Sequence, residues 1–552
     1  MLSIILIWLY MLLTCFLAGY AVIYISSGGK YICKNVTSYL LAGVCVATVY
    51  AEAFSLFAGV GLWANVISIA LLAIISIVLR HRLCECIKSL FNGMNKGTLI
   101  GAVILFLLFA YGTSHGIMHY DSDLYHAQSI RWIEEFGVVK GLGNLHTRLA
   151  YNSAAFCLSA LYSMKFLGMQ SFHSCAGFLA WILAVICGKI FNRKSFIKVS
   201  MANIARIVGI YYLLMIFDEM VSPASDYFMV ILALGVIILF LDMLEAGEKS
   251  YYPYGMLSLA TLVILSVKIS GAFIVLLVIY PAYLLLKEKK YAVIGAFIGA
   301  GLIVVLPFIL RNVILSGYLV YPFPSVDVID VEYKIPVGVA EYDSREIQVY
   351  GRGYTDVTRF EEPIGTWLPD WFRSLGKINK AFFILALAGI PVGIGILIYL
   401  ISKKKTDRWP LLLVSAVIDI CFIFWMCTSP NLRYGCLFLF MAPALSFGLL
   451  YTEVIGFAKK QMVFSAMVIL FFAYKTGTFG VEVVKGFSPS YMLYQQDYGT
   501  YEVTGYDMDG VTIYIPTEGN QVGYEPFPSA PFEAEATLMG TEVKDGFKSN
   551  IR

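Results

Sequence analysis

Long apolar runs recur along the chain, and short polar segments separate them. Three of these runs are ILIWLYMLLTCFLAGYAVIYI near the N-terminus, MVILALGVIILFLDML, and FFILALAGIPVGIGILIYLI. A helix needs roughly 20 predominantly apolar residues to cross the hydrocarbon core of a bilayer. Only helices and closed barrels satisfy their backbone hydrogen bonds there. The pattern therefore predicts a polytopic membrane protein built from α-helices.

Lysine and arginine concentrate in alternate loops between these runs, and the alternation predicts the topology. The basic loops lie at 28–38, 80–96, 287–290, 403–408 and 458–461, whereas the turns at 58–61 and 218–225 contain neither residue. Because cytoplasmic loops carry the excess of positive charge, the N-terminus is predicted to be outside.

The apolar segment 153–168 conflicts with this topology if it crosses the membrane. Crossing would place the basic loop 189–198 outside and invert every later loop. We therefore interpret 153–168 as a juxtamembrane helix at the outer surface, within one external loop.

The remaining runs give about fourteen membrane-spanning helices. The tail contains the strand-like pieces YEVTG and GVTIYIP between Gly and Pro turns, so we expect a small β-containing module there. The predicted fold class is an all-α polytopic membrane protein with external loops and this tail. Its expected parts are a four-helix membrane segment (1–114), an external loop (115–171), membrane helices (172–309), a second external loop (310–379), further membrane helices (380–477) and the external tail (478–552).

Composition agrees with the membrane assignment and excludes other classes. Of the 552 residues, 59% are hydrophobic and only 14% are charged, whereas roughly a quarter are charged in soluble domains. The basic residues are spread over short loops, so the net charge of +3 does not indicate a nucleic-acid partner. The eleven cysteines lie almost entirely in or beside apolar runs, and no disulfide framework is predicted. The first run lacks a basic n-region and a small-residue cleavage site, so we interpret it as a retained span.

Charge gathers in one stretch, HYDSDLYHAQSIRWIEEFG, from His119 to Gly137 at the outer end of a run. Asp123 is placed to cap a helix that begins at Leu124, which leaves Asp121 without a capping role. For an isolated acidic pair, a cap and a solvated loop residue are the simpler interpretation. We nevertheless take both aspartates as catalytic candidates, because other charges share the same boundary. Three more residues of this stretch are substrate-binding candidates: His126, Gln128 and Arg131.

Four charged residues elsewhere are predicted to lie at the same outer boundary: Asp226, Lys268, Arg311 and Arg433. A charge at a membrane boundary is costly, and it commonly marks a substrate or ion pathway. Any one of them alone is explained by snorkelling of its side chain to the interface. Acids and bases on one face together indicate a site for an anionic, partly lipidic substrate.

Three sets of short motifs carry a family resemblance. They are YDSDLYHAQSIRW followed by GLGNLHTRLAYNS, then RNVILSGYLVYP, and then SPNLRYG. Together they resemble the GT-C class of polytopic glycosyltransferases, which includes protein O-mannosyltransferases and lipid A aminoarabinose transferases. The resemblance covers roughly 115–450. In the best-known members the acidic loop follows the first span, whereas here it follows the fourth, so the resemblance implies no role for residues 1–97.

The resemblance implies an inverting sugar transfer from a polyprenyl-phosphate donor to an extracytoplasmic glycan or lipid-linked acceptor, in cell-surface polysaccharide assembly. The active site would face outward from the cytoplasmic membrane. Asp121 or Asp123 would take the acceptor proton, and Asp226 would orient the acceptor or the base. Arg433, Arg311 and Lys268 would offset charge on the leaving phosphate.

No cofactor and no metal site are predicted. His119, His126 and His146 show no metal-ligand spacing, although a divalent ion is left open. The expected partners are the lipid-linked sugar, its acceptor and the bilayer.

Two functions of other classes compete with the glycosyltransferase. An O-antigen-type polymerase or ligase would act on lipid-diphosphate oligosaccharides and depend on external arginines and histidines. A transporter is less favoured, because the sequence shows no internal repeat and the charges are predicted at the outer boundary.

Overall fold

The computed structural model describes residues 1–191, 197–455 and 459–551. The regular secondary structure in this part of the chain consists of helices and four short strands. The helices used below are α1 (Leu2–Ser26), α2 (Val36–Ser55), α3 (Leu62–Val78), α4 (Arg80–Gly93), α5 (Lys96–Ser114), α6 (Ala127–Glu135), α7 (Ala154–Tyr162), α8 (Cys175–Gly188), α9 (Met201–Met215), α10 (Ser225–Glu245), α11 (Tyr251–Val267), α12 (Ile279–Lys287), α13 (Tyr291–Ser316), α14 (Val337–Gly351), α15 (Ile364–Ser374), α16 (Lys377–Ser402), α17 (Trp409–Thr428), α18 (Leu432–Leu449) and α19 (Lys460–Lys485).

The helical segments bear out an all-α polytopic membrane protein. Ten helices in the described residues are long and apolar enough to cross a membrane, and the pair α3 and α4, bent by 88°, is an eleventh candidate. The sequence predicts about fourteen spans. Three of the predicted spans form only short apolar helices in the structure, namely α8, α9 and α11. For these three, crossing stays a prediction.

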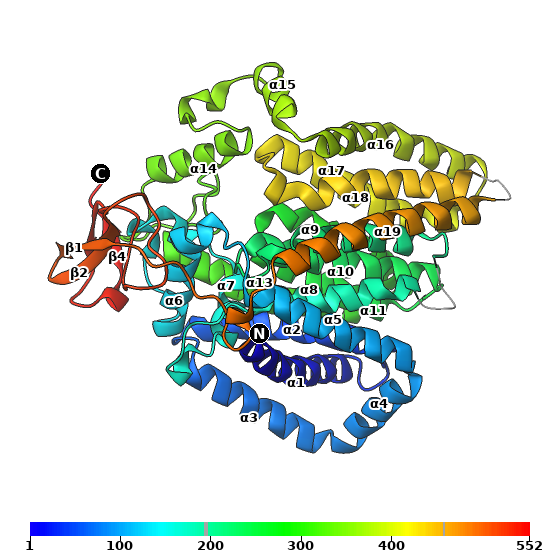
Figure 1. Cartoon of the computed structure of the whole chain (residues 1–552), viewed down its shortest axis with the longest axis horizontal. Coiled ribbons are helices and arrows are strands. Elements are labelled where there is room, and N and C mark those ends of the chain that lie inside the picture. Colours follow the sequence, from blue (N-terminus) through cyan, green and yellow to red (C-terminus); the bar gives the residue numbers. More distant parts are fainter. Residues whose placement is uncertain (192–196, 456–458, 552) are drawn as a thin grey trace.

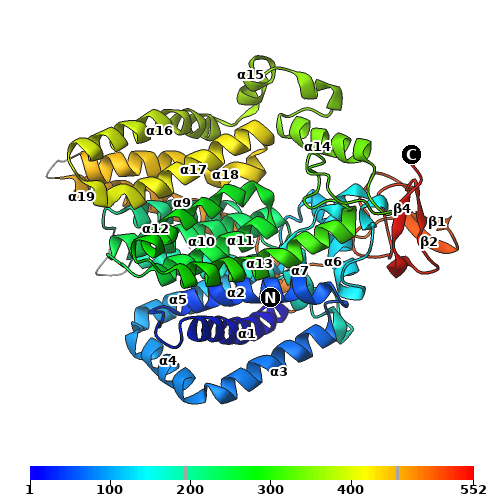
Figure 2. The ribbon, with the colours of Figure 1, turned by 180° about the vertical axis from the view of Figure 1, so that it is seen from behind.

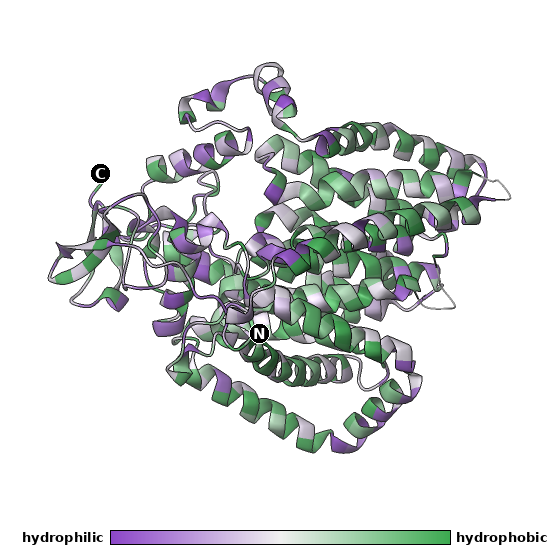
Figure 3. Cartoon of the chain, viewed as in Figure 1, coloured by the Kyte–Doolittle hydropathy of each residue, from purple (hydrophilic) through white to green (hydrophobic). Residues whose placement is uncertain are grey.

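The long helices run side by side, and the polar segments gather at one end of the bundle (Figures 1 and 2). At this end lie α6, α7, α14 and the C-terminal strands, where Figure 3 shows more hydrophilic residues than in the bundle. The connection between α16 and α17, with Lys403, Lys404 and Lys405, lies at the opposite end. Of the basic loop 189–198 used for the topology, residues 192–196 lie outside the described residues.

Helix α10 lies at the centre of the bundle and positions part of the site. It is apolar on every side, as expected of a helix surrounded by protein, and it contacts α8, α9, α11, α17 and α18. Every residue from its first, Ser225, to Leu241 is buried. The first turn of α10 is therefore buried inside the protein at the polar end of the bundle.

The segment 153–168 forms α7 and a short 3-10 turn, Lys165–Leu167. The nine residues of α7 are too few to cross a bilayer, which agrees with a helix that does not cross. However, all nine are buried, and the helix packs on α2 and α6 rather than lying on an outer surface. Small residues such as Ala154, Ala155 and Ala160 let the neighbouring elements approach this closely.

The tail is folded and packs on the first polar loop. Strands β1 (Val503–Met508) and β2 (Val511–Pro516) pair antiparallel, as do β3 (Ala536–Leu538) and β4 (Phe547–Ser549). Hydrophobic residues of tail and loop form one shared core, which includes Trp132, Leu142, Leu149, Met508, Ile513 and Phe547. The β-containing module expected from the sequence is present, and it is attached to the loop that carries the acidic stretch.

Candidate functional site

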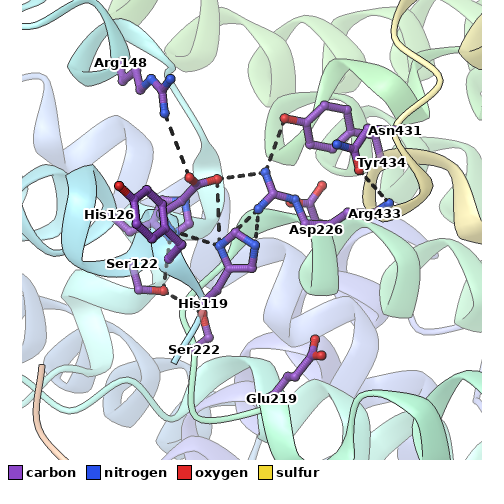
Figure 4. Close-up of polar contacts among 12 residues, drawn as sticks. His119, Ser122, His126, Arg148, Glu219, Ser222, Asp226, Asn431, Arg433 and Tyr434 are labelled. Atoms are coloured by element: carbon purple, nitrogen blue, oxygen red, sulfur yellow. Dashed lines mark hydrogen bonds and ion pairs between the residues drawn. The ribbon is translucent and has the colours of Figure 1, made fainter. Parts of the chain in front are cut away.

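Four of the predicted site residues, Asp121, Asp226, Lys268 and Arg433, meet in one ionic cluster at the polar end of the bundle. Figure 4 shows Arg433 and Asp226 with their polar neighbours. Arg433 is its centre, with Nη2 2.7 Å from Asp121 Oδ2 and Nε 3.2 Å from Asp226 Oδ2. Lys268 Nζ pairs with the other oxygen of Asp226. The cluster thus joins a polar loop to the first turn of α10, to the residue that follows α11 and to the first turn of α18.

Local sequence explains how the bundle presents these charges. Arg433 lies in the first turn of α18, whose backbone N–H at that residue donates to the capping side chain of Asn431. Asp226 lies in the first turn of α10, where the helix dipole favours a negative charge. Lys268 follows the last residue of α11 in an extended conformation, and its Nζ lies 4.1 Å from the centre of the Tyr434 ring.

Asp121 is ionised in this environment. Burial by itself would raise the pKa of its carboxyl, but the positive charge of Arg433 and the hydrogen bond that Arg433 donates act against burial, and the pKa falls to about 2. Its side chain is 14% exposed, so a solvent molecule or substrate can still reach it.

The two histidines beside Asp121 are held neutral. Burial lowers the pKa of His126 to about 3, and it also lowers that of His119, assisted by the nearby Arg433. Arg433 Nη1 donates toward the His119 ring, 3.0 Å from Nδ1. His126 is 2% exposed and lies behind the cluster, with Nδ1 3.5 Å from Ser122 Oγ. His126 therefore supports the loop from within and does not line the site.

Arg148 belongs to the cluster, although the sequence had not singled it out. Its Nη1 lies 3.9 Å from Asp121 Oδ1, and its Nη2 lies 4.0 Å from Glu346 of α14. The sequence feature that could have indicated Arg148 is its place in GLGNLHTRLAYNS, one of the motifs of the GT-C resemblance. Nothing in that motif indicates that its arginine reaches back to Asp121.

A cavity of about 230 Å³ adjoins the cluster. Lys268, Arg433 and Tyr434 form its charged wall. Away from them the lining is a mixture of amides and hydroxyls with aromatic rings, including Asn152, Asn312, Gln348, Thr428, Tyr125, Tyr151, Tyr321 and Phe308. A pocket with a few placed polar groups among apolar walls is typical of small-molecule sites. Its charged wall suits an anion.

Three residues of the acidic stretch face the tail instead of the cluster. Asp123 was expected to cap a helix, yet it lies inside a π-helical turn, Ser122–His126, and accepts hydrogen bonds from Gly499 N and Tyr501 Oη. Gln128 donates to tail carbonyls and accepts from Ser529 N, while Arg131 donates to Tyr524 O. In this structure Gln128 and Arg131 contact the tail, and the substrate-binding role of both stays a prediction.

Arg311 also lies outside the cluster. It is 2% exposed in α13, with Nε 3.0 Å from Asn152 Oδ1 and Nη1 2.5 Å from Ser55 Oγ. Its guanidinium points into the protein beside α2, away from the cluster, and its contact with a phosphate stays a prediction. Packing between α2, α13 and the first loop decides this direction.

Within the residues that the structure describes, no three His, Cys, Asp or Glu side chains are grouped as metal ligands.

Residues 1–440 match the family described as a domain of unknown function, DUF8201. The chain belongs to this family. The matched region contains Asp121, Arg148, Asp226, Lys268 and Arg433 and ends inside α18, so α19 and the tail lie beyond it. Among curated proteins, no sequence matches the chain.

A solved structure, arabinosyltransferase EmbB from Mycobacterium smegmatis, is similar at 14% sequence identity with a TM-score of 0.29. The match covers 66% of this chain and 34% of that chain, so it spans about a third of the arabinosyltransferase. A TM-score of this size does not define a common fold, and the GT-C architecture stays a prediction from the motifs.

Proposed function

We propose that the protein is a membrane glycosyltransferase that moves a sugar from a polyprenyl-phosphate donor to an extracytoplasmic glycan or lipid-linked acceptor. The observation that carries this proposal is the Asp121–Arg433–Asp226–Lys268 cluster, whose two cations Arg433 and Lys268 line a cavity at the polar end of the bundle. The proposed reaction needs a carboxylate beside an anion-binding group, and this cluster supplies both.

The donor phosphate is assigned to Arg433 and Lys268, which both line the cavity. A guanidinium matches two phosphate oxygens at once, and an ammonium adds a mobile point charge. In the cluster, Arg433, Lys268 and Arg148 face the carboxylates Asp121 and Asp226. Glu346, which also faces Arg148, brings the carboxylates to three, so it is the placement of Arg433 and Lys268 at the cavity that favours an anionic ligand.

Asp121 is assigned as the general base. The acceptor hydroxyl oxygen attacks the anomeric carbon, the bond from that carbon to the phosphate oxygen breaks, and the hydroxyl proton passes to the Asp121 carboxylate. The bond electrons leave with the phosphate, and the anomeric centre inverts.

The low pKa of Asp121 bears directly on this role. A carboxylate with a pKa of about 2 is a weak base, and the charge of Arg433 is what opposes burial and lowers it. A phosphate bound to Arg433 would offset that charge, so Asp121 would become a better base when the donor is present. Donor binding and base strength are thereby coupled through one arginine.

A polymerase or ligase of lipid-diphosphate oligosaccharides is the second candidate. The observation in its favour is that Arg148 and His119 stand beside Asp121, since such an enzyme depends on external arginines and histidines. A diphosphate would need more cationic contacts than a single phosphate, and Arg148 could supply them.

The test is sugar transfer by purified full-length protein in lipid nanodiscs. Radiolabelled polyprenyl-phosphate sugars and polyprenyl-diphosphate oligosaccharides are offered in separate reactions with glycan acceptors. Transfer from the monophosphate that Asp121→Asn abolishes supports the proposal. Transfer from the diphosphate alone favours the second candidate, and transfer from neither donor rejects both.

A further inference from the structure

We propose that residues 486–552, the part of the C-terminal tail that follows α19, hold the Asp121 loop in its working position, with Asp123 as the positioning residue. The tail lies beyond the region that matches the family. The catalytic consequence rests on the proposed function, whereas the mechanical contact is testable independently of it.

Donors from two separate tail segments converge on Asp123. Its carboxylate accepts from Gly499 N at 3.0 Å and from Tyr501 Oη at 3.0 Å. Its backbone carbonyl accepts from Val522 N at 2.9 Å and Gly523 N at 2.8 Å. Hydrogen bonds to an ionised carboxylate are among the stronger ones in proteins. Asp123 therefore fastens the π-helical turn to the tail through both its side chain and its backbone.

Two glycines allow the tail to approach this closely. A Cβ at Gly499 would lie 2.8 Å from Asp123 Oδ2, and a Cβ at Gly523 would lie 2.2 Å from Gly499 O. Gly523 also has a φ of +66°, which side chains rarely adopt. The tail backbone is thus shaped to receive Asp123.

The tail also packs along α6. Tyr524 Oη donates to Glu134 Oε2 at 2.5 Å, and Arg131 Nη1 donates to Tyr524 O at 2.9 Å. Trp132 packs against Phe527 and Phe547 with ring centroids 4.8 and 5.9 Å away. These contacts extend the attachment along the helix that follows the turn.

Asp121 lies between this attachment and the membrane helices. On the bundle side the turn is held by Ser122, whose Oγ is 2.6 Å from Ser222 Oγ, and on the tail side it is held by Asp123. Arg433 is fixed in α18, so the 2.7 Å contact to Asp121 depends on where the turn sits. A displacement of about 1 Å in a catalytic group can cost roughly a hundredfold in rate.

The experiment uses full-length protein with Asp123→Ala and Tyr501→Phe. The matched control is Tyr506→Phe, which removes another tail hydroxyl whose hydrogen bond, accepted from Ala534 N, lies within the tail. Amide hydrogen exchange is followed at 119–126 and at 499–523, and kcat and donor KM are measured in parallel.

We expect exchange in both segments to accelerate about ten- to a hundredfold in Asp123→Ala, and less in Tyr501→Phe, while the thermal midpoint stays near that of the control. We expect kcat to fall about tenfold or more in Asp123→Ala, with donor KM nearly unchanged because Arg433 and Lys268 stay in place. A merely structural lesion would lower the thermal midpoint and accelerate exchange throughout the chain.

Unchanged exchange at 119–126 in Asp123→Ala overturns the proposed attachment. Faster exchange with wild-type kcat overturns the positioning role. If the wild-type protein transfers no sugar, the proposed function fails, and the exchange measurements still decide whether the tail holds the loop.

Discussion

Asparagine in place of Asp121 removes the base while preserving the size and shape of the side chain. Oδ2 of Asp121 lies 2.7 Å from Arg433 Nη2, and the side chain is 14% exposed. If this carboxylate takes the acceptor proton, its loss should lower kcat by a factor of about 10²–10⁴. That factor corresponds to roughly 3–5.5 kcal/mol of activation free energy.

The same substitution has a separate and smaller cost in stability. The pKa of Asp121 falls from 3.8 to about 2 on folding, and this difference corresponds to roughly 2.5 kcal/mol in favour of the folded, ionised state. A lowered carboxyl pKa gives stability that is present above pH 3.8 and is lost as the pH falls through 2. At neutral pH the variant should therefore unfold more readily than wild type by about 2 kcal/mol.

The assay is transfer of radiolabelled sugar by purified wild-type, Asp121→Asn and Asp330→Asn proteins, with thermal unfolding measured on the same samples. Asp330 is an exposed carboxylate of the second polar loop and controls for loss of a charge as such. A folded Asp121→Asn protein that transfers sugar at the wild-type rate would refute the assignment of the base.

Arg433→Ala should lower donor kcat/KM about ten- to a hundredfold. Arg433→Lys should recover only part of the lost kcat/KM, since lysine lacks the two-pronged geometry of arginine. Unchanged donor kinetics in Arg433→Ala would remove Arg433 from the site. Asp343→Ala should raise donor KM about tenfold, because the Tyr151 hydroxyl, 2.6 Å from Asp343 Oδ1, loses the acceptor that fixes its ring at the cavity wall. Asp343→Asn keeps an acceptor and is the control. Burial lowers the pKa of His146 from 6.5 to about 3. Between pH 6.5 and about 3, this histidine therefore takes up a proton in the unfolded chain but not in the folded protein. Stability should fall as pH drops below 6.5, by up to roughly 1.4 kcal/mol per pH unit, and unfolding curves of His146→Gln should show a weaker dependence.

The sequence by itself determined the class of the protein and the end of the bundle at which to search. The length of an apolar run indicates which segments can cross the bilayer. These segments are helical because an unpaired backbone is costly in the bilayer. The alternation of Lys and Arg then placed Asp226, Lys268 and Arg433 at one boundary, and the structure brings them within contact distance. A tail with short strands was also evident from its turn residues.

Only the tertiary structure decided which charged residues work together. Asp121 and Asp123 are two positions apart, yet one faces Arg433 and the other faces the tail. Arg311 looks like Arg433 in sequence, but packing beside α2 turns it to Ser55 and Asn152. These pairings join residues up to several hundred positions apart, and local hydropathy carries no information about them. They depend on which helices pack together and on how each loop is held above the bundle.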